Sequence, residues 1–180
     1  MTLLDSILDT NKIFVRPGAF PPLPKNPAKQ FAIFTCMDTR LVDFLEPAMG
    51  IRRGDAKVIK NAGNTVIDPN GGVVRSLVAA IFMLGVEEIL VIGHKDCGMA
   101  TVDTAVLRSS MIARGVAPEA IDALVPDLAQ WMGAFKCPVD NVAEVVAIIR
   151  KSPLLPKSVP VHGLIFDPDD GHLEIIVRGY

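Results

Sequence analysis

The chain alternates short apolar runs with longer segments of helical periodicity, and this alternation limits its possible folds more than any other feature. The apolar runs are short, which favours strands buried on both faces over helices. The clearest run covers residues 88–93. We predict core strands over residues 31–35, 57–60 and 88–93, and late strands over residues 159–166 and 173–177.

Helical spacing of apolar side chains occupies most of the remaining chain. We predict helices over residues 3–13, 41–49, 73–84, 99–114, 118–135 and 142–151. Asp140 or Asn141 is the expected N-cap of the last helix.

Strands that alternate with helices indicate an α/β fold, with a largely parallel central sheet flanked by helices. The turn between Asp167 and Gly171 is short enough for a hairpin, so we expect the last strand to be antiparallel.

The first 30 residues differ from the rest of the chain. Five of the 14 prolines lie between Pro17 and Pro27, and each fixes φ and removes a backbone donor. We therefore predict an N-terminal helix and an extended arm over residues 1–30, followed by a core over residues 31–180. A length of 180 residues suits a single domain, 1–180. The helix could pack on a neighbouring subunit or on its own domain, and its spacing favours neither.

Composition excludes several classes of protein. With 18 basic and 20 acidic residues, the chain has no basic excess to neutralise phosphates, so we expect no nucleic-acid partner. Glu87 and Glu88 interrupt the strongest apolar stretch, and the N-terminus lacks the pattern of a signal peptide, so we expect no membrane association and a cytoplasmic location. Three cysteines do not build a disulfide framework, and they suit a reducing compartment.

Two segments concentrate the reactive side chains. The segment from Cys36 to Arg40 directly follows the first core strand, and the segment from His94 to Gly98 follows the third. Ligands of open α/β sheets bind beyond the carboxyl ends of the strands, so neighbouring strands would bring both segments to one crevice. Cysteine, histidine and carboxylate together form a plausible ligand set for zinc.

The spacing within these segments has a physical interpretation. In extended chain, residues 36, 38 and 40 point the same way, so Asp38 can pair with the planar guanidinium of Arg40. His94 and Cys97 are three residues apart, which places them on one side of a helical turn. Cys97 would also open the next helix, where partial positive charge favours its thiolate.

Other motifs and reactive residues carry less weight. The pattern is neither a tandem CxxC zinc finger nor a thioredoxin motif, and the chain has no GxGxxG or P-loop. We interpret Cys137 as a spare cysteine. His162 and His172 are expected to be structural, although both, with Asp96, are candidates for a proton route.

The two segments resemble those of the β-class carbonic anhydrases, in particular the smaller prokaryotic members. That family has a Cys-x-Asp-x-Arg segment, then Asn-Ala-Gly-Asn, then Gly-His-x-x-Cys-Gly. Here these segments are residues 36–40, 61–64 and 93–98, and the similarity continues through residues 161–167 and 171–173. Thr39, Lys95 and Met99 depart from residues that the family often has, and they put the pocket lining in question.

The resemblance implies a zinc enzyme that reversibly hydrates carbon dioxide to bicarbonate and a proton by means of a zinc-bound hydroxide. It implies one zinc ion per subunit and self-association as a homodimer or tetramer. Asp38 would be either the fourth ligand or the partner of a zinc-bound water, with Arg40 as its dyad partner. By the same resemblance the zinc ligands are Cys36, His94 and Cys97, and the substrate contacts are Ala62 and Gly63.

Three other functions remain open from the sequence. The same fold and site could hydrolyse carbon disulfide or carbonyl sulfide, because function depends on the pocket. A closed four-ligand zinc site could be purely structural, although Arg40 argues against it, since a permanent ligand needs no switching partner. A thiol redox protein would form a disulfide between Cys36 and Cys97 and would bind no zinc.

Overall fold

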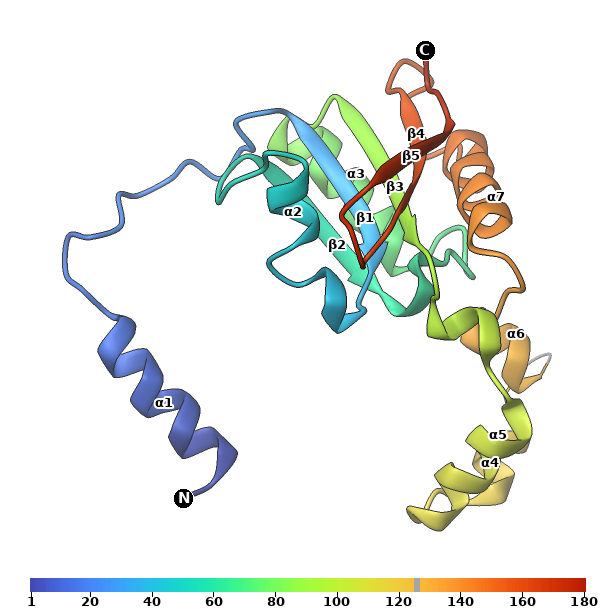
Figure 1. The fold of residues 1–180 in the computed structure, drawn as a ribbon. Coiled ribbons are helices and arrows are strands. Elements are labelled where there is room, and N and C mark those ends of the chain that lie inside the picture. The colour runs from blue at the N-terminus through green and yellow to red at the C-terminus, as the bar shows by residue number, and fades with distance from the viewer. Residues whose placement is uncertain (125–126) are drawn as a thin grey trace.

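The computed structural model describes residues 1–124 and 127–180 (Figure 1). Within these residues it contains one mixed sheet with the strand order β2-β1-β3-β4-β5. The three β1–β2, β1–β3 and β3–β4 pairs are parallel and the β4–β5 pair is antiparallel. The predicted fold class, including the antiparallel last strand, is confirmed. The strand bounds are β1 Phe31–Cys36, β2 Ala56–Asn61, β3 Glu88–His94, β4 Val161–Phe166 and β5 Leu173–Val177.

Helices cover both faces of this sheet. On one face α3 and α7 pack on side chains of β1, β3 and β4, and on the other face the segment around α2 packs on Ile33, Ile92 and Phe166. The helix bounds are α1 Leu3–Phe14, α2 Leu45–Ala48, α3 Gly72–Leu84, α4 Thr104–Ala113, α5 Pro118–Asp122, α6 Leu128–Met132 and α7 Pro138–Lys151.

The predicted helix over residues 41–49 is wrong in extent. The structure has a single 3₁₀ turn, Thr39–Leu41, followed by the short α2. Asp43 lies between them with a φ of 55°, in the left-handed region that an α-helix of L-residues does not use. The apolar spacing reflects two separate turns that bury Leu41 and Leu45 against the same face of the sheet.

The two helices predicted over residues 99–114 and 118–135 are each divided. A 3₁₀ turn, Gly98–Thr101, precedes α4, whose N-cap Asp103 accepts hydrogen bonds from two backbone N–H groups. The second segment contains α5 and α6, and Asp127 caps α6. Residues 125 and 126, which the prediction also included, lie outside the described residues. Side chains that accept backbone hydrogen bonds therefore start new helices inside an apolar periodicity that continues.

The last helix begins earlier than predicted. Cys137 is the N-cap of α7 and Pro138 is its first residue, so the expected cap at Asp140 or Asn141 is wrong. Proline suits this position because its φ is helical and the first turn needs no N–H donor. Asn141 is consequently inside the helix and buried, which matters for the site described below.

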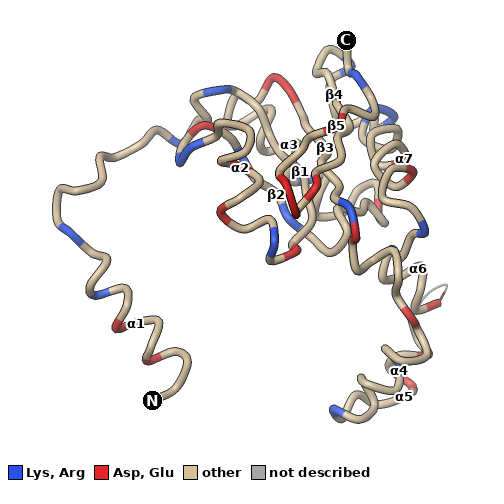
Figure 2. Tube along the Cα trace, in the orientation of Figure 1, with Lys and Arg blue, Asp and Glu red and all other residues tan. Residues whose placement is uncertain are grey.

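The N-terminal helix and its extended arm are as predicted. Thr2 and Asp5 form a capping box at the start of α1, and Figure 1 shows α1 standing away from the sheet at the end of the arm. No residue of α1 is buried by contact with the described part of the chain. Basic and acidic residues are interspersed along the trace in Figure 2. Among the described residues, no helix is both long and apolar enough to span a bilayer.

Candidate functional site

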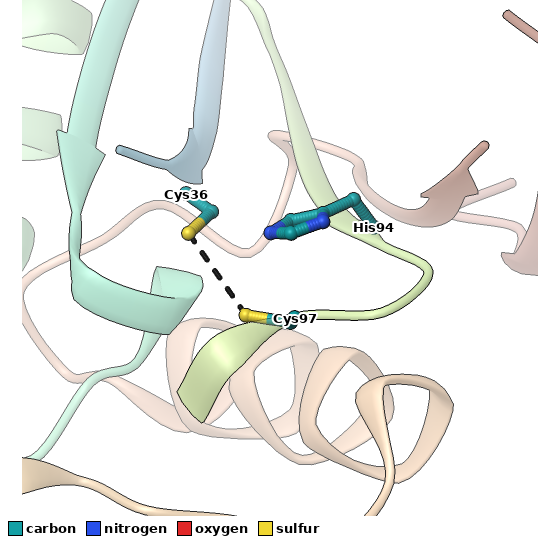
Figure 3. A group of neighbouring side chains, drawn as sticks. All are labelled: Cys36, His94 and Cys97. Carbon is teal, nitrogen blue, oxygen red and sulfur yellow. Dashed lines mark hydrogen bonds between the residues drawn. The ribbon is translucent and has the colours of Figure 1, made fainter. Parts of the chain in front are cut away.

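The structure brings Cys36, His94 and Cys97 together at one end of the sheet (Figure 3). Cys36 is the last residue of β1 and His94 the last of β3, and these strands are parallel neighbours. The ligand atoms of the three residues lie within 4.8 Å of one another. The three side chains are at most 5% exposed. The prediction that both segments reach one crevice therefore agrees with the fold.

The connection between His94 and Cys97 is a turn rather than the helical turn expected from the spacing. Asp96 has a φ of 51°, which reverses the chain after β3 and returns Cys97 to the sheet end. The Lys95 backbone N–H donates to the Phe166 carbonyl, and the Lys95 ammonium lies 2.8 Å from an Asp167 oxygen. These contacts attach the turn to the β4–β5 hairpin.

The His94 ring is oriented by one backbone contact. Its Nδ1 lies 2.8 Å from the Lys95 carbonyl oxygen, which can only accept, so Nδ1 carries the proton and Nε2 presents a lone pair. Nε2 is buried and has no hydrogen-bond partner among the described residues. Burial lowers the pKa of His94, but the nearby Cys36 sulfur and the hydrogen bond to the Lys95 carbonyl outweigh it, so the net shift is upward.

The two sulfur atoms lie 4.0 Å apart. The Cys97 thiol, as hydrogen-bond partner, lowers the pKa of Cys36 to about 4, against an opposing effect of burial. The same contact raises the pKa of Cys97, because a second thiolate there would face the first. A buried pair of sulfurs beside an unpartnered imidazole nitrogen is a donor set that fits zinc, since a divalent cation compensates both thiolates and uses the nitrogen lone pair.

Asp38 and Arg40 form the predicted pair, but around a turn rather than along an extended chain. Asp38 is the N-cap of the turn Thr39–Leu41 and accepts hydrogen bonds from the Arg40 backbone N–H, Nε and Nη2 at 2.9, 3.1 and 2.9 Å. The Arg40 guanidinium lowers the pKa of Asp38 to about 2, and the pKa of Arg40 is raised in return. Oδ2 of Asp38 lies 3.8 Å from His94 Nε2, so the pair borders the three-residue cluster.

Asp96 also belongs to the site, and its contact with Arg40 was not predicted from the sequence. Arg40 Nη1 donates to its carboxylate at 3.0 Å, and Nη2 donates to its backbone carbonyl at 2.7 Å. Arg40 is thus shared between two carboxylates, one from each of the two segments. The opposite charges of Arg40 and Asp96, on segments expected to meet, were the available signal.

Ala62 and Gly63, the predicted substrate contacts, form the 3₁₀ turn Ala62–Asn64 that follows β2. Ala62 packs against the apolar cluster that includes Cys36. Gly63 is buried with a φ of 69°, and an added Cβ would lie 2.8 Å from Met99 and 2.9 Å from Phe135. The turn therefore requires glycine at this position. Contact with substrate stays a prediction.

The remaining histidines and cysteine lie outside the cluster. His162 lies near the start of β4 and pairs with Leu90 of β3, whereas His94 pairs with Phe166 at the other end of the same two strands. It accepts a hydrogen bond from the Gly179 N–H and lies 3.0 Å from a Glu88 oxygen, contacts that favour the structural interpretation. His172 is exposed in the β4–β5 hairpin, and Cys137 caps α7.

Comparison with known proteins gives a consistent result. A family model described as carbonic anhydrase matches residues 31–173. The chain superimposes on the solved β-carbonic anhydrase isoform I of Trichomonas vaginalis with a TM-score of 0.95 and 42% identity, covering 100% of both chains. It is 34% identical to β-carbonic anhydrase 1 of Mycobacterium tuberculosis over 96% of this chain and 97% of that protein. It is also 31% identical to the carbon disulfide hydrolase of Acidithiobacillus thiooxidans, over 84% of this chain and 78% of the hydrolase.

Proposed function

Because the chain belongs to the β-carbonic anhydrase family, we propose that it catalyses the reversible hydration of carbon dioxide to bicarbonate and a proton. The observation that carries the proposal is the convergence of Cys36, His94 and Cys97 beside an ionised Asp38 that Arg40 holds. The fold alone would not support it, since related folds serve several reactions.

Cys36, His94 and Cys97 would hold one zinc ion per subunit. When bound, zinc would supply the Lewis acidity that makes water a nucleophile. Asp38 is the remaining candidate ligand. In the structure Arg40 engages both of its oxygens, which supports a role for Asp38 beside the metal rather than on it.

The chain's own residues would act on the attacking water. The Asp38 carboxylate accepts a hydrogen bond from the water and orients its oxygen toward carbon dioxide. Arg40 keeps that carboxylate ionised and in place. Because Asp96 also binds the guanidinium, Arg40 stays anchored if Asp38 moves toward the cluster. Among the candidates for proton release, Asp96 is 86% exposed and adjoins this network.

Hydration activity is expected to rise toward alkaline pH. Two thiolates and a neutral imidazole would leave a zinc site near zero charge, and such a site would acidify water less than a three-histidine site, whose bound water has a pKa of about 7. Asp38, with a pKa of about 2, and Arg40, with a raised pKa, keep their charges throughout this range, so neither produces the rise. Stopped-flow hydration across pH measures the profile. Activity that is flat or falls with increasing pH would contradict the assignment of ligands.

A second candidate function is hydrolysis of carbon disulfide or carbonyl sulfide, favoured by the similarity to a carbon disulfide hydrolase. Product assays on the three substrates with one zinc-loaded sample distinguish the reactions. We expect bicarbonate from carbon dioxide at the highest kcat/KM. Sulfide release from carbon disulfide without carbon dioxide hydration would replace our proposal with the second candidate.

Two non-hydrating alternatives are less well supported. In a purely structural zinc site, Asp38 would be a permanent ligand and would need no guanidinium partner, whereas Arg40 binds it. A thiol redox protein would form a Cys36–Cys97 disulfide and bind no zinc, so metal analysis of the purified protein distinguishes it.

We also propose that the chain assembles as a homodimer or tetramer through α1. Leu4 is 63% and Ile7 is 55% exposed, on a helix that buries none of its residues against the described part of its own chain. The double variant Leu4→Glu/Ile7→Glu is expected to lower the molar mass measured by light scattering to that of a smaller assembly, because the charges cannot be buried against a second copy. Asp9→Asn, at a polar position of α1, is the control and should keep the native mass. A monomeric native chain would contradict the proposal.

A further inference from the structure

The loop after β2 is held rigidly by its own polar groups. The Asn61 side chain donates to the Thr65 carbonyl at 2.8 Å and accepts from the Thr65 N–H at 3.1 Å, which closes the loop across both ends. The Thr65 hydroxyl also donates to the Ala62 carbonyl at 3.3 Å. The Asn-Ala-Gly-Asn segment is thus a braced turn in which Gly63 occupies the centre.

Gly63 connects this loop to the sulfur cluster on one side and to α7 on the other. Its N–H donates to Cys36 Sγ at 3.3 Å. Its carbonyl accepts a hydrogen bond from Asn141 Nδ2 at 3.0 Å. Met99 and Phe135 fill the space around its Cα, so Gly63 cannot move far without disturbing both side chains.

Asn141 is an unusual residue for its position. It lies in α7 among the core residues Val142 and Val145, yet it is polar and only 6% exposed. A buried amide is costly unless its groups are hydrogen-bonded, and the bond to Gly63 is the one that the structure gives its Nδ2. A fully apolar helix face would pack on the sheet equally well, which indicates that the amide serves the loop.

We propose that Asn141 is a positioning residue for the metal centre, acting through the Gly63 backbone on the sulfur of Cys36. The inference rests on the proposed function, because it requires Cys36 to be a metal ligand. A hydrogen bond to a thiolate withdraws electron density from sulfur, so the sulfur donates less to the metal and the metal remains a stronger Lewis acid. Asn141 fixes the residue that provides this bond.

The same contacts give Gly63 a role in addition to the predicted substrate contact, which stays a prediction. Its N–H is engaged by Cys36 and its carbonyl by Asn141, so both backbone polar groups already have partners. Gly63 acts on the reaction through the ligand sulfur.

Cobalt(II) in place of zinc tests the proposal, because thiolate-to-cobalt charge transfer in the near ultraviolet reports the electron density on sulfur. Asn141→Leu and Asn141→Ala in the full chain remove the amide, and the smaller alanine also favours helix, so this variant should fold. In both variants we expect the charge-transfer band to move to lower energy. We expect the zinc-loaded forms to lose between about 10- and 100-fold in kcat or in zinc affinity, as is usual when a residue that orients a metal ligand is substituted.

Val146→Ala is the matched control, since Val146 is a core residue on α7 that belongs to the same apolar cluster as Val142. It should lower thermal stability while leaving the cobalt spectrum unchanged. If the Asn141 variants lose stability but their spectra superimpose on that of the native protein, Asn141 is only a packing residue and the proposal is wrong. If the native chain itself shows no thiolate-to-cobalt band, the metal site fails and the proposed function fails with it.

Discussion

Cys97→Ala is expected to abolish stoichiometric zinc binding and reduce carbon dioxide hydration to background. The change leaves Cys36 and His94 as ligands, and two ligands do not hold zinc in a site built for at least three. Substituting a residue that only orients a metal ligand lowers metal affinity by about 10- to 100-fold, so removing a ligand itself should lower zinc affinity further. Zinc content by atomic spectroscopy and stopped-flow hydration measure the two effects.

The chain provides its own control for this variant. Cys137→Ala removes a free cysteine at the start of α7, outside the cluster, and should retain both zinc and activity. Cys97→Ala protein that is fully loaded with zinc and active would show that Cys97 is not a ligand.

Asp38→Ala is expected to keep its zinc and to lose about 10²- to 10⁴-fold in kcat, because the attacking water loses the carboxylate that accepts its hydrogen bond and orients it. Retention follows from the geometry, since Arg40 rather than the cluster holds both Asp38 oxygens. The loss follows because no other carboxylate in the described residues takes the same place, and Asp96 contacts the far side of Arg40. Zinc content and kcat measured on one preparation check both parts.

Asp43→Asn is the matched control for Asp38. Asp43 is an exposed carboxylate in the left-handed region, where asparagine is well tolerated, and its loss should change neither zinc content nor kcat. Loss of zinc from Asp38→Ala would contradict the prediction and identify Asp38 as a resting ligand.

The central strands β1, β3 and β4 were predictable from sequence because they are short apolar runs that the fold must bury. The helices were less so, since apolar periodicity does not show where a side chain interrupts it. Asp103 and Asp127 each start a helix by capping it, and Asp43 ends the continuity of residues 41–49 through its own backbone conformation. Local hydrogen bonds of this kind decide where helices begin and end, but they leave only a weak signal in a single sequence.

The clustering of Cys36, His94 and Cys97 followed from the rule that parallel strands end at one edge of a sheet. The local geometry did not follow from spacing, because Asp96 reverses the chain where a helical turn was expected. Asn141 could not be found from the sequence at all. Its contact with Gly63 joins residues 78 positions apart, and it depends on how α7 packs beside the loop after β2.

Titrating zinc into chelator-treated protein, with carbon dioxide hydration followed by stopped flow at alkaline pH, tests the central claim most directly. We predict that activity is absent without metal, rises in proportion to added zinc and reaches its plateau at one zinc ion per chain. Protein that binds one zinc ion per chain and hydrates no carbon dioxide at any pH would contradict the claim.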